Sequence, residues 1–428
     1  MLDPTTMHSP ERIRVLLSEG SSLSARQTIT ALGQRGYVLD VCDPDPLCLG
    51  RFSRFVRHYY RSPAAGTDPL GYLAFMLDRL TQDPYDVLLP VHEQAFLFAK
   101  VRDRLPPTVG VALADFAAFM QVQSKAAFTR LLAELVLPQP ASRIVRTQAE
   151  LAEPRACPYY VKTAYSTAGQ GVWRVEGADS LARAIAALAE QGLLDGETEI
   201  VVQDVAPGAL CQVQAVFAHG QLVAVHCMQT RGVSLGGGHS ARVSVDHPAV
   251  RTHIAQLGRH LIWHGPIALD YLFDEASGQP SYIEANPRLV EPMNAALSGV
   301  NLAALVVRVA LGEAEVGEKP HVGRIGVRSH SLLAILLGVA GQGGSRRDVV
   351  RHITQAILHR GLYADSREDV TPLRNDPASV LPLAIVIGHL LRDPRAAKRL
   401  GAGAIAAYSL TADAVETILA LKSSEVSL

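Results

Sequence analysis

The stretch that decides the fold is Gly265-Pro-Ile-Ala-Leu-Asp-Tyr-Leu-Phe-Asp274, followed after a turn at Ser277-Gly278 by Pro280-Ser-Tyr-Ile-Glu-Ala-Asn-Pro-Arg288. Both halves have strand character, and a Ser-Gly turn between two such runs is typical of a β-hairpin. In a hairpin of this kind, Asp270 and Glu284 are expected to lie side by side on one face of the sheet. The chain around them should therefore contain antiparallel β-structure.

The polar residues of this hairpin have the chemistry of a metal site. Two adjacent carboxylates repel each other unless a cation lies between them, and Asn286 points a neutral oxygen to the same face as Glu284. Hard oxygen ligands suit Mg²⁺, with Mn²⁺ as a compatible substitute, and phosphates and water complete the shell. Solvated strand carboxylates are the alternative; they would explain Asp270 alone better than the full set of Asp270, Glu284, Asn286 and Arg288.

A glycine-rich stretch precedes the hairpin: Tyr159-Tyr-Val-Lys-Thr-Ala-Tyr-Ser-Thr-Ala-Gly-Gln-Gly171. Lys162 ends an expected buried strand and can reach a phosphate. The small residues after it, including Ser166 and Gly169, let backbone N–H groups close over phosphate oxygens. As structure alone, Lys162 could extend to solvent from an edge strand and the glycines could form an ordinary turn. The stretch on its own leaves both interpretations open.

Between these two motifs lies Glu199-Ile-Val-Val-Gln-Asp-Val-Ala-Pro-Gly208, an apolar strand that runs into a Pro-Gly turn. A strand end of this kind offers backbone donors and acceptors to a flat heterocycle, with apolar neighbours to stack on it.

The flanking segments predict the rest of the architecture. Short apolar runs alternate with helical spacing over about residues 12–118, which indicates a parallel sheet covered by helices. Ser124 is a suitable N-cap for a helix from Lys125 to about Leu135. The chain is thus expected to be α/β and then α+β, with domains at 1–118, 119–312 and 313–428, the last one mainly helical. The expected N-terminal strands are Ile13–Leu17, Tyr37–Cys42, Val87–Leu89 and Val109–Leu113, and the expected C-terminal helices are Leu332–Leu337, Arg347–Leu358, Leu381–Leu391 and Ala412–Leu421.

Taken together and in this order, the three motifs resemble the ATP-grasp superfamily over about Ser124 to Gly312. The preceding parallel sheet resembles the pre-ATP-grasp domain that usually accompanies it. The most specific part, Gly265 to Arg288, resembles biotin carboxylases, carbamoyl phosphate synthetases and amino-acid ligases.

The resemblance implies ATP and Mg²⁺ as cofactors and assigns a role to each motif. By this resemblance, Lys125 and Lys162 would contact the nucleotide phosphates, and a hinge at Gln203, Asp204 and Ala206 would bind adenine. Asp270, Glu284 and Asn286 would bind Mg²⁺, and Arg288 would lie beside the reacting phosphate. Two positions depart from the family pattern. Many relatives have Glu where this chain has Gln203, and another Glu shortly after the hinge glycine, where Leu210, Cys211 and Gln212 stand.

Two further segments supply candidate substrate residues. Gln229 to Arg242 contains three consecutive glycines next to Arg231 and Arg242, which predicts a mobile loop that binds an acyl phosphate or a substrate carboxylate; a flexible hairpin with solvated arginines is the alternative. As a lone histidine in this loop, His239 could be exposed without a role or could act as a base on the substrate. Glu93 opens a helix beside the crevice, where the helix dipole alone favours a carboxylate; related amino-acid ligases have an acidic residue there that contacts the substrate amine.

Composition excludes several other functions. Forty Lys and Arg against 41 Asp and Glu leave a net charge of −1, so no global basic field recruits nucleic acid or an anionic membrane. The longest apolar runs are shorter than the roughly 20 residues of a membrane span, and no secretory signal is seen. We therefore expect a cytoplasmic protein. The odd number of cysteines indicates reduced core residues: Cys42, Cys48, Cys157, Cys211 and Cys227.

The sequence thus predicts an ATP-dependent carboxylate-amine ligase that activates a carboxylate as an acyl phosphate, with an amino acid or a related small acid among its substrates. Three alternatives stay open: carboxylation through carboxyphosphate, phosphoryl transfer without ligation, and a nucleotide-binding sensor without turnover. The expected partners are a small carboxylate and a small amine. The oligomeric state is not determined, and a homodimer is compatible with the sequence.

Overall fold

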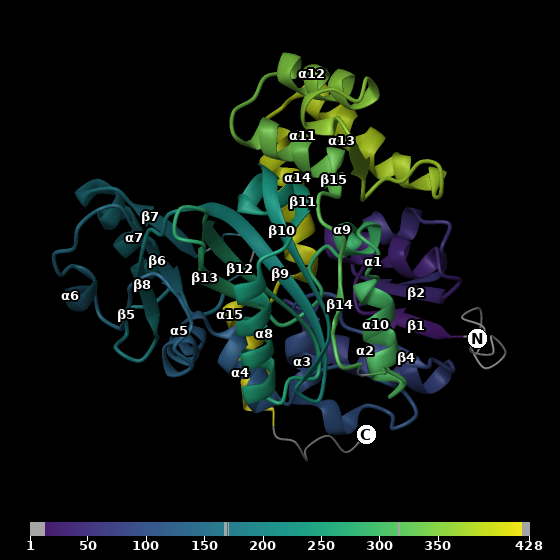
Figure 1. The fold of residues 1–428 in the computed structure, drawn as a ribbon, viewed down its shortest axis with the longest axis horizontal. Helices are drawn as coiled ribbons and strands as arrows, with labels where there is room; N and C mark the ends of the chain where they lie inside the picture. Colours follow the sequence, from purple (N-terminus) through teal and green to yellow (C-terminus); the bar gives the residue numbers. More distant parts are fainter. Residues whose placement is uncertain (1–12, 167–168, 170, 316, 422–428) are drawn as a thin grey trace.

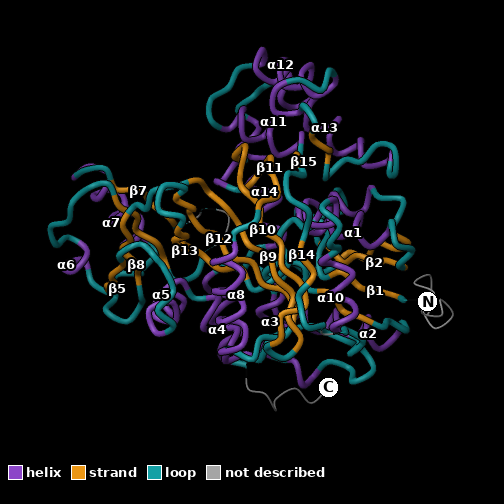
Figure 2. The backbone as a smooth tube through the Cα atoms, viewed as in Figure 1, coloured by secondary structure: helices purple, strands orange, loops and turns teal. Residues whose placement is uncertain are grey.

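The computed structural model describes residues 13–166, 169, 171–315 and 317–421. Within this part of the chain the strands form three sheets, one parallel and two mainly antiparallel. Figure 1 shows the parallel sheet and the small antiparallel sheet on opposite sides of the hairpin β12–β13 (Gly265–Asp274 and Gln279–Asn286). Figure 2 shows the strands of the large sheet running through the middle of the molecule, with helices around them.

The N-terminal sheet is parallel, as the sequence predicts, with strand order β3-β2-β1-β4. One expected strand is wrong: Val109–Leu113 contributes a single bridge, between Gly110 and Val87. The edge strand β3 was not expected, because most of its residues are polar or amphipathic and the segment lacks an apolar run. The elements are β1 (Arg14–Leu17), α1 (Leu23–Gly33), β2 (Val38–Asp43), β3 (Val56–Arg61), α2 (Pro69–Gln82), β4 (Val87–Leu89) and α3 (Gln94–Lys100).

The middle of the chain forms the two antiparallel sheets. Ser124 caps α5 by accepting a hydrogen bond from the backbone N–H of Ala127 at 3.3 Å, so this helix begins at the expected residue. The small sheet contains β5 (Ser142–Val145), β6 (Tyr159–Thr163), β7 (Val172–Val175) and β8 (Ile200–Asp204), and the large sheet is built on β9 (Ala209–Ala218), β10 (Gln221–Val233), β11 (His239–Val245), β12 and β13. The helices here are α4 (Phe116–Gln123), α5 (Lys125–Glu134), α6 (Gln148–Leu151), α7 (Ala178–Glu190), α8 (Pro248–His260), α9 (Met293–Leu297) and α10 (Leu302–Ala310).

The C-terminal region is mainly helical, as expected, but it also extends the large sheet. Strands β14 (His321–Val322), β15 (Arg328–His330) and β16 (Ser366–Glu368) join that sheet. The helices are α11 (Leu332–Gly341), α12 (Arg346–Ile357), α13 (Val380–Arg392), α14 (Ala396–Tyr408) and α15 (Ala412–Ala420), of which α14 was not expected. No helix of the described residues is long and apolar enough to span a membrane. The cysteines are unpaired; four are buried as expected and Cys157 is exposed.

Gly265 fixes the start of β12 against the N-terminal part of the chain. Its φ is +103°, and a Cβ at this position would lie 2.3 Å from the carbonyl oxygen of Ala112. Both the backbone conformation and the space therefore require glycine. Gly278, in the hairpin turn, shares the left-handed conformation with a φ of +67°, but a Cβ there would meet no atom within 4 Å.

Gly265→Ala should lower the free energy of unfolding by at least about 2 kcal/mol, because it adds a steric clash to the backbone strain. The matched variant Gly278→Ala should cost about 1 kcal/mol, the strain alone. Urea denaturation followed by circular dichroism measures both. Equal losses for the two variants would contradict this account of how β12 is held.

Candidate active site

The hairpin β12–β13 brings the two predicted carboxylates together. Asp270 and Glu284 are direct partners in its register, and Asp270 also lies opposite Gln212 of β9. A register shift just after Asp270 marks a bulge between the two strands. Bulges of this kind re-aim side chains next to binding sites.

Among the described residues, the hydrogen-bond and ion-pair partners of these two carboxylates are a lysine and side-chain N–H groups. Lys125 Nζ lies 2.9 Å from Glu284 Oε1, and Gln212 Nε2 donates to Asp270 Oδ1 at 2.7 Å. His239 Nε2 lies 3.3 Å from the same Asp270 oxygen. The carboxylate pair therefore already attracts a lysine cation and N–H groups from other elements, which is the electrostatic behaviour expected of a cation site.

The oxygen donors fit a magnesium ion that takes part of its shell from phosphate. Asn286 Nδ2 lies 3.5 Å from Asp270 Oδ2, and its Oδ1 accepts a hydrogen bond from Arg288 at 3.2 Å, so the three predicted ligands and the arginine are neighbours. No group of three or more His, Cys, Asp or Glu suited to a metal occurs among the described residues. A site with two carboxylates and an amide depends on ligands from substrate, as Mg²⁺ sites commonly do.

The two predicted phosphate-binding lysines both lie near Glu284. Lys125 Nζ donates to the hydroxyl and the carbonyl oxygen of Ser166, both at 3.0 Å. Lys162 Nζ donates to Gln203 Oε1 at 2.7 Å and to the carbonyl of Ile283 at 3.1 Å. Burial lowers the pKa of Lys162 to about 8, although Glu284 opposes this shift. An incoming phosphate would supply the negative charge that this buried amine lacks.

Most of the predicted site residues line one cavity of about 610 Å³, a volume typical of small-molecule sites. Ser166 contributes through Lys125 and is not part of the lining. Glu93, Arg231 and Arg242 are not in the lining either, and Thr167, Ala168 and Gln170 of the glycine-rich stretch lie outside the described residues. The predicted residues that line the cavity are Lys125, Lys162, Gly169, Gln203, Asp204, Ala206, His239, Asp270, Glu284, Asn286 and Arg288.

The two arginines of the segment Gln229 to Arg242 lie in different environments. Arg231 is exposed, whereas Arg242 is fully buried and pairs with Asp369 at 2.7 Å and with Glu291. Solvation is therefore the wrong interpretation for Arg242, because its charge is neutralised by carboxylates from two distant segments. His239 is also buried, with Thr230 on Nδ1 and Asp270 near Nε2.

Many residues that line the cavity were not predicted, and His92, Tyr408 and Glu291 are among them. His92, which precedes the predicted Glu93 in sequence, lines the cavity; its side chain is 5% exposed and its Nδ1 has no hydrogen-bond partner among the described residues. Burial, reinforced by Arg288, lowers the pKa of His92 well below its usual value, so the imidazole is neutral. Tyr408 of α14 packs on it with ring centroids 4.0 Å apart. Glu291 has a φ of +45°, and strained backbone of this kind gathers at functional sites.

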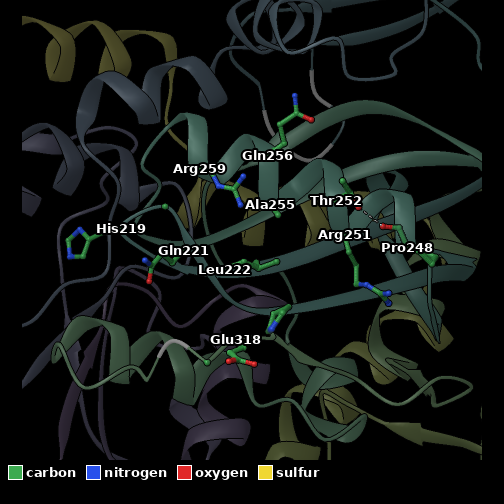
Figure 3. A pocket seen from close by; sticks show the side chains of 13 residues that line it. His219, Gln221, Leu222, Pro248, Arg251, Thr252, Ala255, Gln256, Arg259 and Glu318 are labelled. Carbon is green, nitrogen blue, oxygen red and sulfur yellow. Dashed lines mark hydrogen bonds between the residues drawn. The ribbon is translucent and has the colours of Figure 1, made fainter.

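A second, more open groove lies between α8 and the β9–β10 turn. Figure 3 shows Arg251 and Arg259 projecting from α8, with Glu318 on the opposite wall. Arg251 is already paired with Asp246. None of the predicted site residues lines this groove, so the cavity around Asp270 is the candidate active site.

The architecture defines the class: the described chain has the ATP-grasp fold. Among solved structures it matches the L-amino acid ligase of Bacillus licheniformis with a TM-score of 0.55 and 17% identity, over 72% of this chain and 78% of that one. It matches the biotin carboxylase domain of the Hydrogenobacter thermophilus 2-oxoglutarate carboxylase, a dimer bound to MgADP and bicarbonate, with a TM-score of 0.58 and 14% identity, over 74% and 73%.

A third similar structure is the phosphoribosylamine–glycine ligase of Thermotoga maritima, with a TM-score of 0.54 and 15% identity over 74% of this chain and 78% of that one. No family model and no curated protein matches the sequence. At these identities the likeness establishes the fold, which ligases and carboxylases share.

Arg242→Met should lower the free energy of unfolding by about 3–5 kcal/mol, because it leaves Asp369 buried without its cation. Adding Asp369→Asn should recover part of that loss. Thermal unfolding measures both variants, with Arg231→Met as the control because that arginine is exposed. Equal melting temperatures for Arg242→Met and the wild type would show that the buried ion pairs do not stabilise the fold.

Proposed function

We propose that the protein is an ATP-dependent carboxylate-amine ligase that acts through an acyl phosphate and uses Mg²⁺. The observation that carries this proposal is the convergence of two carboxylates, an amide, two lysines and an arginine on one cavity: Asp270, Glu284, Asn286, Lys125, Lys162 and Arg288. Anionic and cationic groups in this arrangement suit a magnesium-bound polyphosphate. That one similar structure holds MgADP supports the same assignment.

The hinge residues and the apolar residues of the cavity suit the adenine of ATP. The backbone and side chains of Gln203, Asp204 and Ala206 would hold adenine, and Tyr160, Val172, Leu210, Leu272 and Ile283 supply an apolar surface for the base. Gln203 holds Lys162 by a neutral amide. A glutamate at that position would hold it by a charge, so the glutamine leaves more of the lysine's charge for phosphate.

The proposed reaction has two steps. A carboxylate oxygen of the substrate attacks the γ-phosphorus of ATP, the bond to the β-phosphate oxygen breaks, and ADP leaves. The amine then attacks the acyl carbon, the bond between that carbon and the phosphate oxygen breaks, and inorganic phosphate leaves as the amine loses a proton. Mg²⁺ held by Asp270, Glu284 and Asn286 would neutralise phosphate charge in the first step. Lys125, Lys162 and Arg288 stabilise the same charge from the protein side.

The substrate class follows from the groups beside this centre. Arg288 can hold a substrate carboxylate, and Glu291 and Glu93 are acidic groups in its neighbourhood that can attract an ammonium group. These groups suit an amino acid as one of the two substrates. The similarity to an L-amino acid ligase and to a phosphoribosylamine–glycine ligase agrees with this choice.

Hydroxylamine trapping tests the proposal. With ATP, Mg²⁺ and an amino acid, the enzyme should form the amino-acid hydroxamate and ADP without a second substrate, because hydroxylamine intercepts the acyl phosphate. Glu284→Gln should slow ADP release by about 100-fold, because it removes a charged ligand of the Mg²⁺ ion that neutralises the transferring phosphate. Glu275→Gln, at an exposed carboxylate of the same hairpin, is the matched control and should leave the rate unchanged.

One outcome would overturn the proposed reaction, and a second would overturn the assignment of Glu284 to the metal site. ADP formation driven by bicarbonate alone, without stimulation by any amino acid, would assign the enzyme to the carboxylases. Wild-type rates in Glu284→Gln at limiting Mg²⁺ would remove that residue from the metal site.

A further inference from the structure

One wall of the cavity is apolar and comes from the C-terminal helices. We define this apolar wall as Leu333 and Leu337 of α11 with Leu400, Ala404 and Ile405 of α14. The region that supplies it carries no recognisable motif in the sequence. It nevertheless faces the same cavity as the metal and phosphate residues.

The spacing of these residues shows that α14 presents one face to the cavity. Leu400, Ala404 and Tyr408 recur every four residues, and Gly401 and Ile405 lie beside them. On this face Ala404 is exposed, and Leu400 and Ile405 are half-buried. An accessible apolar surface inside a cavity is more informative than one on the outer surface, because the cavity is where a ligand would cover it.

The apolar wall is close to the proposed reaction centre. Tyr408 follows Ala404 by one helical turn, about 6 Å along the axis, and it packs on His92 and shares the cavity lining with Arg288. A substrate whose carboxylate reaches Arg288 could therefore place its side chain along α14.

ATP does not account for this wall. The apolar surface proposed for adenine belongs to β6, β7, β9, β12 and β13. Figure 1 shows the small sheet, which carries β6 and β7, on one side of β12 and β13, and α11 and α14 on the other. The two apolar surfaces thus come from different elements of the cavity lining.

On the basis of the proposed function, we propose that the apolar wall binds the side chain of the amino-acid substrate, that this side chain is branched aliphatic or aromatic, and that Ala404 limits its size. A charged side chain would be desolvated there without a partner, because the five residues of the wall carry no polar side-chain atom. A small side chain would leave the apolar wall exposed to water, so it would gain little from burial there. Leucine and phenylalanine should therefore be better substrates than glycine, aspartate and lysine.

The test compares kcat/KM for ADP release with glycine, alanine, leucine, phenylalanine, aspartate and lysine. In the wild type, leucine or phenylalanine should exceed glycine and aspartate at least tenfold. Ala404→Phe should fill the space and lower kcat/KM for leucine and phenylalanine at least tenfold more than for alanine. Ala402→Phe is the matched control, because Ala402 is exposed on the same helix and does not line the cavity.

Leu400→Ala makes the opposite change and covers the case in which Ala404→Phe does not fold. It should enlarge the space and raise the preference for phenylalanine over leucine. Unchanged relative specificity in both variants, or a wild-type preference for aspartate or lysine, would overturn the inference while leaving the ligase proposal intact. Absence of ADP release with every amino acid would contradict the ligase proposal instead. Calorimetric titration with phenylalanine would then test whether the apolar wall binds an apolar side chain. If phenylalanine did not bind to the wild type, this inference would be overturned.

Discussion

The site depends on one electrostatic constraint: Asp270 and Glu284 face each other on adjacent strands and need positive charge between or beside them. At a separation of about 4 Å and an effective dielectric constant near 20, two such charges repel by on the order of 4 kcal/mol. The protein meets this repulsion with Lys125 from α5, Gln212 from β9 and His239 from β11. Three elements far apart in sequence are thereby oriented toward one point.

The same constraint explains why the site suits a magnesium-bound polyphosphate. The protein's own cations offset the carboxylates in part, and Lys162 loses proton affinity because it is buried. A metal ion with attached phosphates brings both signs of charge at once, so it satisfies carboxylates and lysines together. A neutral ligand would satisfy neither set. This is why the charged residues, more than the shape of the cavity, carry the functional proposal.

The local parts of this arrangement could be predicted from sequence. The Ser277-Gly278 turn predicted the hairpin, although the direct pairing of Asp270 with Glu284 also requires the register shift just after Asp270. Ser124 predicted the helix that begins at Lys125. Long-range pairs could not be predicted. Arg242 pairs with Asp369, which lies 127 residues further along the chain, and nothing in the glycine-rich segment around Arg242 indicates that this arginine has a buried partner. The helix α14 was missed because Gly401 and Gly403 weaken its helical propensity.

The three-dimensional structure explains why glycine stands at position 401. A Cβ at Gly401 would lie 2.4 Å from the side chain of Leu235, and one at Gly341 would lie 2.3 Å from it, so Leu235 occupies a slot between α14 and α11. The C-terminal helices therefore hold the loop beside His239 and also line the cavity. Because the C-terminal region carries no recognisable motif, these contacts are the evidence that it contributes to the candidate site.

Oxygen transfer from substrate to phosphate tests the central claim most directly. The amino acid that supports ADP release would be labelled with ¹⁸O in its carboxylate, turned over with an amine, and the inorganic phosphate analysed by mass spectrometry. An acyl phosphate leaves one carboxylate oxygen on phosphorus when the amine attacks the acyl carbon, so one ¹⁸O atom should appear in each phosphate. Phosphate free of the label would contradict the acyl-phosphate mechanism.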